Sequence, residues 1–260
     1  ESGIGTVNTI RNTKFETTFT GEVGLRGNYS TIFNYAMEVS PVDESNLNQS
    51  LIIVTPNTID YGGITEMWTD GSAIAFCPLS EDSYPYDARG IIQHEAGGHG
   101  FGKLGDEYIY HNTFIDFCDC TCCEHVFEFN IAKSLGWYEN LSLTGKMHEV
   151  PWSHLIFDDR YSDVVDIYEG GFMHARGVFR SEQNSCMNNN ISYYNAISRE
   201  AIVKRIMEYA GESYSFEKFV ENDKRDAVNS LSRSAERPGV TVRGNQYVPR
   251  IHKGKPDILK

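Results

Sequence analysis

Apolar positions in the first third of the chain predict short strands separated by turns. The segment 31–40 mixes apolar and polar residues ahead of Pro41, the apolar run at 51–55 is followed by Pro56, and 72–76 is a third short apolar run. Short apolar runs that are bounded by turn-forming residues are typical of strands. We therefore expect strands in these three segments, with the polar residues 43–46 forming a loop.

Later segments show helical patterns. A helix is expected over 87–101, although the glycines that follow residue 96 are poor helix formers. Segment 124–135 places its apolar residues on one stripe, and Gly136 ends it. A further helix is expected to begin at Ser198, a suitable N-cap, and to end at Gly211. Its apolar face comprises Ile202, Val203, Ile206, Met207 and Ala210.

The net charge of the protein bears on which kinds of molecule it is expected to bind. The 260 residues include 23 Lys and Arg against 36 Asp and Glu, which gives a formal net charge of −13. Nucleic acids and anionic membrane surfaces are both bound through basic faces, so neither is expected to be the main partner. The longest apolar runs span only a few residues, and we expect no membrane-spanning segment.

The charge is unevenly distributed along the chain. Residues 1–220 contain 14 basic and 31 acidic side chains, whereas 221–260 contain nine basic and five acidic ones. The residues 221–260 are expected to form a basic arm that wraps the surface.

The six cysteines indicate the cellular compartment in which the protein is expected to function. Four of them lie within 118–123, and the other two are Cys77 and Cys186. Such a cluster is unusual in a cytosolic protein without a metal or redox role, so we expect a secreted, periplasmic or cell-surface protein. Disulfides that close the loop at 118–123 are favoured over a second, structural zinc. Cys77 and Cys186 would then pair with each other or with the cluster.

The segment 94–108 contains the residue types of a catalytic zinc site. Zinc binds imidazole nitrogen and carboxylate oxygen, and a hydrolytic site keeps one position open for water. A glutamate beside the first histidine would accept the proton of that water. The segment reads His94-Glu95-Ala96-Gly97-Gly98-His99-Gly100-Phe101-Gly102-Lys103-Leu104-Gly105-Asp106-Glu107-Tyr108.

The spacing of the two histidines requires an irregular helix. The familiar zinc-binding helix has histidines at i and i+4, whereas His94 and His99 are at i and i+5. In a regular α-helix the i+5 side chain is rotated by about 140° from the first, so the two rings would point apart. A π-bulge adds one residue to a turn and often occurs at functional sites. We predict a π-bulge at the pliable residues between His94 and His99.

An acidic residue that follows the second histidine is expected to supply the third ligand. Gly102 can turn the chain sharply, which would let Asp106 return toward the metal. Glu107 is the second choice, because spacing alone does not separate two adjacent acids.

Two segments resemble the zinc metallopeptidases of the IgA-peptidase family. Similarities at 33–41 and 198–210 extend the resemblance over most of 30–210. The family pattern is matched with one residue inserted between Glu95 and His99. The matching residues are Gly98-His99, Phe101-Gly102, Leu104 and Asp106-Glu107-Tyr108, and, in a segment like that of the family's Met-turn, Phe179-Arg180-Ser181 and Asn184-Ser185-Cys186-Met187-Asn188.

The resemblance implies a fold and a set of roles. The fold would be metzincin-like and of the α/β (α+β) class. An N-terminal subdomain over 1–102 would hold a twisted, mostly parallel sheet and the active-site helix, and a smaller C-terminal subdomain over 103–220 would contain the Met-turn segment. The zinc ligands would be His94, His99 and Asp106. Glu95 would be the catalytic acid/base, and Met187 would be the Met-turn residue beneath the metal.

Three further residues are candidates for contact with substrate. In metzincin-like sites a tyrosine near the Met-turn can stabilise the oxyanion, which makes Tyr193 and Tyr194 candidates. His174 is a candidate for binding zinc or for polarising a substrate carbonyl.

The expected function is a zinc-dependent endopeptidase with one catalytic Zn²⁺, acting as a monomer on protein or peptide substrates. One alternative is a surface or metal-binding protein of the same fold, in which the inserted residue has abolished catalysis. Another is a metal-dependent hydrolase of a non-peptide amide or ester. The sequence specifies neither the substrate nor the cleavage specificity.

Overall fold

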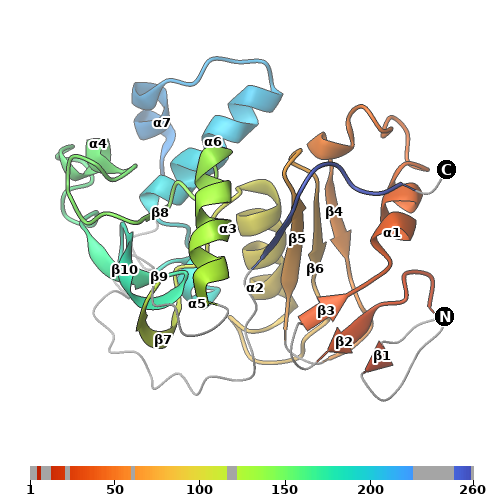
Figure 1. Cartoon of the computed structure of the whole chain (residues 1–260). Helices are drawn as coiled ribbons and strands as arrows, with labels where there is room; N and C mark the ends of the chain where they lie inside the picture. The colour runs from red at the N-terminus through yellow and green to blue at the C-terminus, as the bar shows by residue number, and fades with distance from the viewer. Residues whose placement is uncertain are drawn as a thin grey trace. The chain divides into compact units, whose positions relative to one another are not determined.

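The computed structural model describes residues 5–6, 13–20, 24–59, 62–115, 122–224 and 249–258 (Figure 1). The chain divides into two compact units: unit 1 comprises Glu1–Phe101 and Gly239–Lys260, and unit 2 comprises Gly102–Pro238. The last residues of the chain, from Gly239 onward, are assigned to unit 1.

The fold is mixed α/β, in agreement with the class expected from the sequence. Its helices include one 3₁₀ turn, η1, and one π-helix, η2. In the described part of the chain the helical elements are α1 (Tyr29–Ala36), η1 (Leu47–Gln49), α2 (Ala88–Ile92), η2 (Gln93–Phe101), α3 (Cys122–Ser134), α4 (Ser153–Ile156), α5 (Cys186–Asn189), α6 (Ala196–Tyr209) and α7 (Phe216–Asn222).

The described strands form three sheets, with the orders β1-β2-β3, β11-β5-β6-β4 and β7-β10-β8, and β9 pairs with β10. The strands are β1 (Gly5–Thr6), β2 (Thr18–Thr20), β3 (Gly24–Arg26), β4 (Leu51–Val54), β5 (Ile64–Trp68), β6 (Ala73–Phe76), β7 (Ile109–Phe114), β8 (Leu141–Ser142), β9 (Tyr168–Gly171), β10 (Met173–Arg180) and β11 (Arg250–His252).

The four-stranded sheet of unit 1 is mixed. Strand β4 is parallel to β6, and β11 is parallel to β5, but β5 and β6 are antiparallel. A tight turn joins β5 to β6, in which the N–H of Trp68 donates to the carbonyl of Ser72 and Gly71 has a φ of +102°. So short a connection can only join antiparallel neighbours. The mostly parallel sheet that we expected is therefore interrupted at this hairpin.

Different elements cover the two faces of this sheet. Along β6, Ile74 and Phe76 belong to a cluster with Phe33 of α1, whereas Ala75 packs with Cys77 and with residues of α2 and η2. Successive side chains of a strand point to opposite faces, so this alternation places α1 on one face and α2–η2 on the other. On β6, Ala75 therefore faces η2, and the larger Ile74 and Phe76 face α1.

The expected strand at 31–40 is wrong, because this segment contains helix α1. The side chain of Asn28 caps the helix by accepting a hydrogen bond from the N–H of Thr31. Ile32 and Phe33 are buried against the sheet, and Phe33 packs edge-on against Trp68 with ring centroids 4.9 Å apart. Mixed apolar and polar residues over so few positions fit either a strand or a short helix, and the cap decides between them.

The other expected elements agree more closely with the structure. Strands β4 and β6 and helix α3 occur where they are predicted, and Gly136 follows α3 with a φ of +73°. Helix α6 begins two residues before Ser198, because Asn195 is its cap and accepts a hydrogen bond from the Ser198 N–H. The side chains that α6 buries lie in its first half, whereas Ile206 is 49% exposed, so the expected apolar face is only partly buried.

Unit 2 contains a cluster of aromatic rings and an apolar core. Phe129, Tyr138 and Phe172 form a ring cluster with centroid distances of 5.5–6.1 Å. The larger apolar core is built from loops and from α4, α6 and α7. Its buried members are Val150, Trp152, Leu155, Tyr161, Val164, Val165, Ala196, Ile197 and Phe219.

The last strand, β11, is fixed to unit 1 by a buried carboxylate. Glu66 of β5 is fully buried and accepts a hydrogen bond from Tyr29 Oη at 2.9 Å. Its other oxygen lies 2.8 Å from Nε2 of His252 in β11, and the His252 ring stacks on Trp68. The end of the expected arm is thus an integral edge strand of this sheet.

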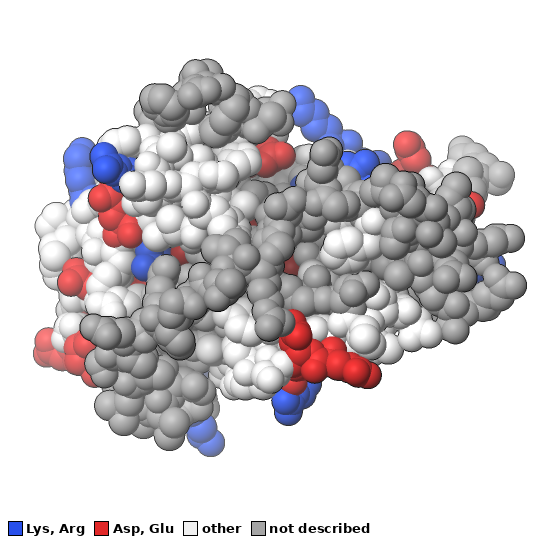
Figure 2. Space-filling view, turned by 90° about the horizontal axis from the view of Figure 1, so that it is seen from below, with Lys and Arg blue, Asp and Glu red and all other residues white. Residues whose placement is uncertain are grey.

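Within the described residues, no helix combines the length and the apolar character needed to cross a membrane. On the face shown in Figure 2, the described acidic and basic side chains lie in small separate groups, and neither sign forms a continuous field there.

Truncating Phe33 should destabilise the protein. Phe33→Ala removes a fully buried ring from the core between α1 and the sheet. We expect the free energy of unfolding to fall by about 3–5 kcal/mol, as is typical of buried Phe→Ala changes. Urea denaturation measures this loss. Val39→Ala, at a position that is 61% exposed, is the control and should change the free energy of unfolding by less than about 0.5 kcal/mol.

Candidate metal centre

Helix α2 continues directly into the π-helix η2. Asp87 caps α2, since its carboxylate accepts hydrogen bonds from the backbone N–H groups of Arg89 and Gly90. From Gln93 to Phe101 the chain is π-helical over nine residues. This confirms the predicted departure from α-helical geometry between the two histidines, and the irregular segment is longer than a single bulge.

The π-helix brings the two imidazoles together. Its hydrogen bonds span one residue more than those of an α-helix, so the i+5 side chain stands near the place that i+4 would take. The Nε2 atoms of His94 and His99 are accordingly 3.1 Å apart, and their ring centroids are 4.8 Å apart. Both side chains are buried.

Small residues give this helix its room against the sheet. A Cβ atom at Gly100 would lie 2.7 Å from Cδ1 of Leu51 in β4, so a larger residue at this position would require the Leu51 side chain to move. Ala96 packs against Ala75 of β6 and against Cys77. The glycine-rich sequence that weakens an α-helix therefore fits a wide helix packed closely on the sheet.

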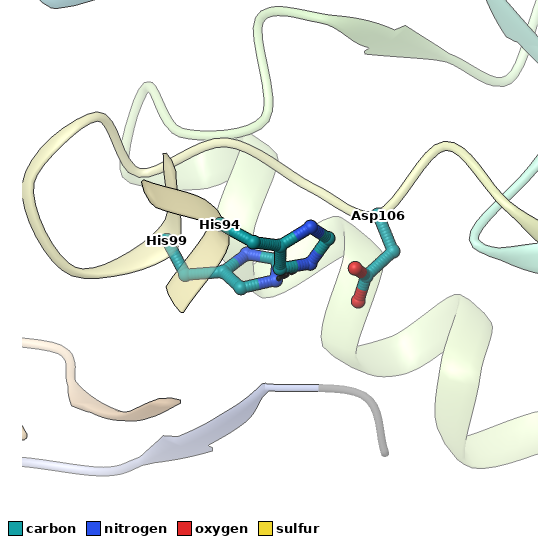
Figure 3. Close-up of side chains that lie close together, drawn as sticks. All are labelled: His94, His99 and Asp106. Carbon is teal, nitrogen blue, oxygen red and sulfur yellow. Dashed lines mark hydrogen bonds between the residues drawn. The ribbon is translucent and has the colours of Figure 1, made fainter. Parts of the chain in front are cut away.

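The carboxylate of Asp106 completes a group of three possible metal ligands (Figure 3). One ligand atom from each of His94, His99 and Asp106 lies within 4.8 Å of the other two, and all three residues are buried. In the close-up the carboxylate lies beside the two rings. It is the one such group of His, Cys, Asp and Glu among the residues that the structure describes.

The geometry of this group suits a metal ion. With metal–nitrogen bonds of about 2.0–2.1 Å and tetrahedral angles, two ligand nitrogens would be about 3.3 Å apart. The 3.1 Å separation of the His94 and His99 nitrogens is close to this spacing. Two imidazoles and one carboxylate are also a donor set that zinc accepts, with a fourth position remaining for another ligand. These residues could therefore hold a divalent metal ion.

Glu95 is held by the neighbouring strand. Glu95 is 9% exposed, and its Oε2 accepts a hydrogen bond of 2.9 Å from the hydroxyl of Thr65 in β5. The same hydroxyl lies 2.9 Å from the Glu95 carbonyl oxygen. Thr65 stands on the face of β5 that η2 covers, opposite to the face that carries Glu66. The strand thus fixes both the backbone and the carboxylate of Glu95.

The turn that follows η2 differs from the predicted one. The left-handed residue there is Lys103, with a φ of +52°, and it takes the place that we assigned to Gly102. Lys103 is almost fully buried, and its Nζ lies 5.0 Å from the centroid of the Trp137 ring. This cation–π contact helps to hold a backbone conformation that a non-glycine residue rarely adopts. No feature of the local sequence identified Lys103 in advance.

Glu107 has a structural role instead of joining the group of ligands. It is fully buried, and one oxygen accepts hydrogen bonds from the Nδ2 atoms of Asn140 and Asn195, while the other accepts from the Ser185 hydroxyl. Burial raises the pKa of this carboxyl above its usual value, although these three donors and Arg180 oppose the shift. Of the two adjacent acids, the structure therefore places Asp106 with the histidines.

Met187 lies in helix α5, close in the fold to the segment that contains Asp106. Its side chain is fully buried and packs with Leu104 and Ala201, and its carbonyl accepts a hydrogen bond from the N–H of Glu107 at 2.8 Å. This contact ties the segment with the expected Met-turn residue to the segment with the expected third ligand. The sequence alone gave no reason to expect a backbone bond between them.

The side chains of both tyrosines that follow α5 interact with nearby residues. Tyr193 is buried and donates from its hydroxyl to Oε2 of Glu182 at 2.7 Å, and burial together with the charge of Glu182 raises the pKa of Tyr193 to about 12. Tyr194 interacts with the Cys186 thiol, and burial raises the pKa of Tyr194 well above its usual value. A contact of either tyrosine with a substrate stays a prediction.

His174 also lies outside that group. It is buried on β10, with Nδ1 3.1 Å from the Thr113 hydroxyl and Nε2 3.0 Å from Nδ1 of His125. Burial, with contributions from His125 and His111, lowers the pKa of His174 to about 4. The imidazole is therefore neutral at neutral pH.

The expected disulfides are not seen where the structure describes cysteines. Cys77 and Cys186 are buried thiols that do not form a disulfide, so the pairing expected for them is wrong. Cys77 is enclosed by Ala75, Ile91 and Ala96, and burial raises the pKa of its thiol well above the usual value. The side chains of the 118–123 cluster lie outside the described residues.

Comparison with known proteins adds no relative. No protein-family model matches the chain, and no match is found among curated proteins. The chemistry of the site rests on its own residues.

Removing the Glu107 carboxylate should destabilise unit 2. Glu107→Ala would leave two buried amide donors and one buried hydroxyl without their shared acceptor. We expect the free energy of unfolding to fall by about 3–5 kcal/mol, as when one partner is removed from a buried ionic network. The matched control is Glu149→Ala, since Glu149 pairs with Lys146 at the surface and its loss should leave the urea midpoint nearly unchanged. Equal effects of the two changes in urea denaturation would contradict this role.

Proposed function

We propose that this protein is a zinc-dependent endopeptidase of metzincin-like build. The proposal is supported by the resemblance of 94–108 and 179–188 to the IgA-peptidase family of zinc metallopeptidases. It is supported further by the mixed α/β fold and by the buried group of His94, His99 and Asp106. The acidic net charge is compatible with a protein or peptide substrate.

The observation that carries the proposal is the π-helix. The inserted residue gives His94 and His99 an i, i+5 spacing, which in an α-helix would turn the two rings apart. In the π-helix their Nε2 atoms are 3.1 Å apart, so the insertion is compatible with a metal site. The insertion is the feature that set this chain apart from the family pattern. With the two rings together, it is no longer an argument against a functional metal site.

Each residue of the site has a chemical role in this proposal. A bound zinc ion would polarise the scissile carbonyl and lower the pKa of the attacking water. His94, His99 and Asp106 would hold the ion. Glu95 would accept the proton of the attacking water and donate it to the leaving amine. Thr65 acts as a positioning residue, because its hydroxyl fixes the Glu95 carboxylate.

The first test concerns Glu95. Glu95→Gln keeps the size of the side chain but removes the base. We expect the rate of peptide cleavage to fall by about 10²–10⁴-fold, while the zinc content stays unchanged. Cleavage of a mixed peptide library is followed by mass spectrometry, and zinc is measured in the same samples. Wild-type activity should be lost with a chelator and restored by Zn²⁺.

The outcomes separate the alternatives. Wild-type protein that binds zinc but cleaves neither peptides nor a panel of amides and esters would indicate a binding protein of this fold. Cleavage of non-peptide amides or esters alone would indicate the other hydrolase class. Normal peptide cleavage by Glu95→Gln would contradict the assigned role of Glu95.

The second test concerns Thr65. Thr65→Val keeps the shape of the side chain and removes the hydroxyl that lies 2.9 Å from Glu95 Oε2. We expect kcat to fall by roughly tenfold or more, because a small displacement of a catalytic group is costly. The acid limb of the pH–rate profile should shift, and zinc content should not change. Thr65→Ser restores the hydroxyl and should recover most of the rate, whereas equal losses in both variants would argue for a packing effect.

A further inference from the structure

The last described strand of the chain closes one edge of the four-stranded sheet in unit 1. Strand β11 runs parallel to β5 and pairs with residues 66–68. The N–H of Thr69 donates to the carbonyl of His252 at 2.9 Å, which continues the pairing beyond the two strands. His252 comes 186 positions after Glu66 in the sequence, so a distant segment of the chain forms the neighbour of β5.

Both basic side chains of β11 contact one buried carboxylate. Glu66 of β5 is fully buried, with Oε2 2.8 Å from Nε2 of His252 and Oε1 3.5 Å from Nη1 of Arg250. Tyr29 of α1 donates from its hydroxyl to Oε1 at 2.9 Å. The His252 ring also stacks on Trp68, with the centroids 4.6 Å apart. Both ion-pair contacts that the structure describes for Glu66 therefore come from β11.

The residue before Glu66 is the one that holds Glu95. Thr65 points to the opposite face of β5, where its hydroxyl lies 2.9 Å from Oε2 of Glu95. Two residues earlier, a Cβ atom at Gly63 would lie 2.7 Å from Cγ of Glu95 and 3.0 Å from its Oε1. Strand β5 thus passes directly against the Glu95 side chain, and a shift of this strand would shift the contacts of Glu95.

The buried charge makes the position of β5 depend on β11. When one partner of a buried ion pair is removed, the remaining charge is left uncompensated, which is strongly destabilising. Glu66 would then be driven toward solvent, and the peptide unit that joins it to Thr65 would move with it. Strand β6 pairs with the other edge of β5, but no hydrogen bond described here links the Glu66 side chain to β6.

The form of β11 also indicates more than a cover for the sheet edge. The strand has only three residues, so its backbone pairing is short. Arg250 and His252 are two positions apart and lie on one face of the strand, which is the face that meets Glu66. A strand that only shielded the edge would not require two basic side chains at a buried carboxylate.

We propose that β11 is a positioning element of the proposed active site. Through Glu66 it fixes the backbone of β5, and thereby the Thr65 hydroxyl and the Glu95 carboxylate. His252 and Glu66 are positioning residues, because they act on Glu95 through Thr65. This inference rests on the proposed function, since it assigns Glu95 a role in hydrolysis. It makes the rate of hydrolysis depend on the C-terminal strand, whereas zinc binding does not depend on it.

Replacement of His252 tests this role in the full chain. His252→Phe keeps a ring for stacking on Trp68 but removes the nitrogen that faces Glu66, and the partly exposed site should tolerate the change. We expect kcat for peptide cleavage to fall about tenfold, with KM and zinc content unchanged, because a small displacement of a catalytic group is costly. His252→Gln retains an N–H donor and should recover most of the rate. The control is His148→Phe, since His148 stacks on Phe157 in unit 2, and its kcat should equal that of the wild type.

A double variant tests whether the effect passes through Thr65. Coupled residues show non-additive effects when both are replaced. If β11 acts by placing the Thr65 hydroxyl, adding His252→Phe to Thr65→Val should lower kcat little further than Thr65→Val alone. A merely structural role of β11 predicts that the two losses multiply.

A crystal structure of the His252→Phe variant provides a readout that needs no activity. The Thr65 hydroxyl and Oε2 of Glu95 should be more than about 3.5 Å apart, instead of 2.9 Å. Wild-type protein that cleaves no substrate would contradict the proposed function alone, and this structure would still decide whether β11 positions Glu95. An unchanged separation, an unchanged kcat in His252→Phe, or multiplied losses in the double variant would overturn the role of β11.

Discussion

The π-helical path of Gln93–Phe101 is the constraint on which the candidate site depends. A regular α-helix would turn His94 and His99 away from each other, whereas the observed backbone brings their Nε2 atoms to 3.1 Å. The helix packs closely on the sheet, because Gly100 lies against the Leu51 side chain and Ala96 lies against Ala75 of β6. The group of His94, His99 and Asp106 therefore depends on the backbone path of a wide helix that packs closely on this sheet.

A second constraint is the buried carboxylate of Glu107. It joins the Asn140 loop, Ser185 before α5 and Asn195 at the start of α6, so one charge organises three segments of unit 2. Asn195 also caps α6, and the Glu107 N–H bonds to the carbonyl of Met187. The two adjacent acidic residues therefore have different roles: Glu107 stabilises the fold, whereas Asp106 lies beside the two histidines. A network of this kind is strongly stabilising only when every donor is satisfied.

The sequence pattern predicted correctly those helices and strands whose limits are marked by residues within or next to the element. The apolar runs of β4 and β6 and the stripe and closing glycine of α3 are local features, and the structure places these elements as predicted. It failed at α1, because the mixed residues of 31–40 fit two periodicities and the Asn28 cap was overlooked. It also misplaced the start of α6, where Asn195 competes with Ser198 as a cap and wins through its additional bond to Glu107. The C-terminal strand β11 has no such local signal, since its place beside β5 depends on a long-range bond to Glu66.

The sequence by itself determined the residue types of the candidate centre and, through the i, i+5 spacing, the need for a π-helical turn. It also determined the acidic balance and the mixed α/β class. Only the tertiary structure decided that Asp106 and not Glu107 joins the histidines, that Cys77 and Cys186 remain thiols, and that the His252 imidazole meets the buried carboxylate of Glu66. The physical reason is the range of the interactions. Helical spacing and capping are set by neighbours in the chain, whereas the partner of a buried carboxylate, thiol or imidazole is chosen by packing between distant segments.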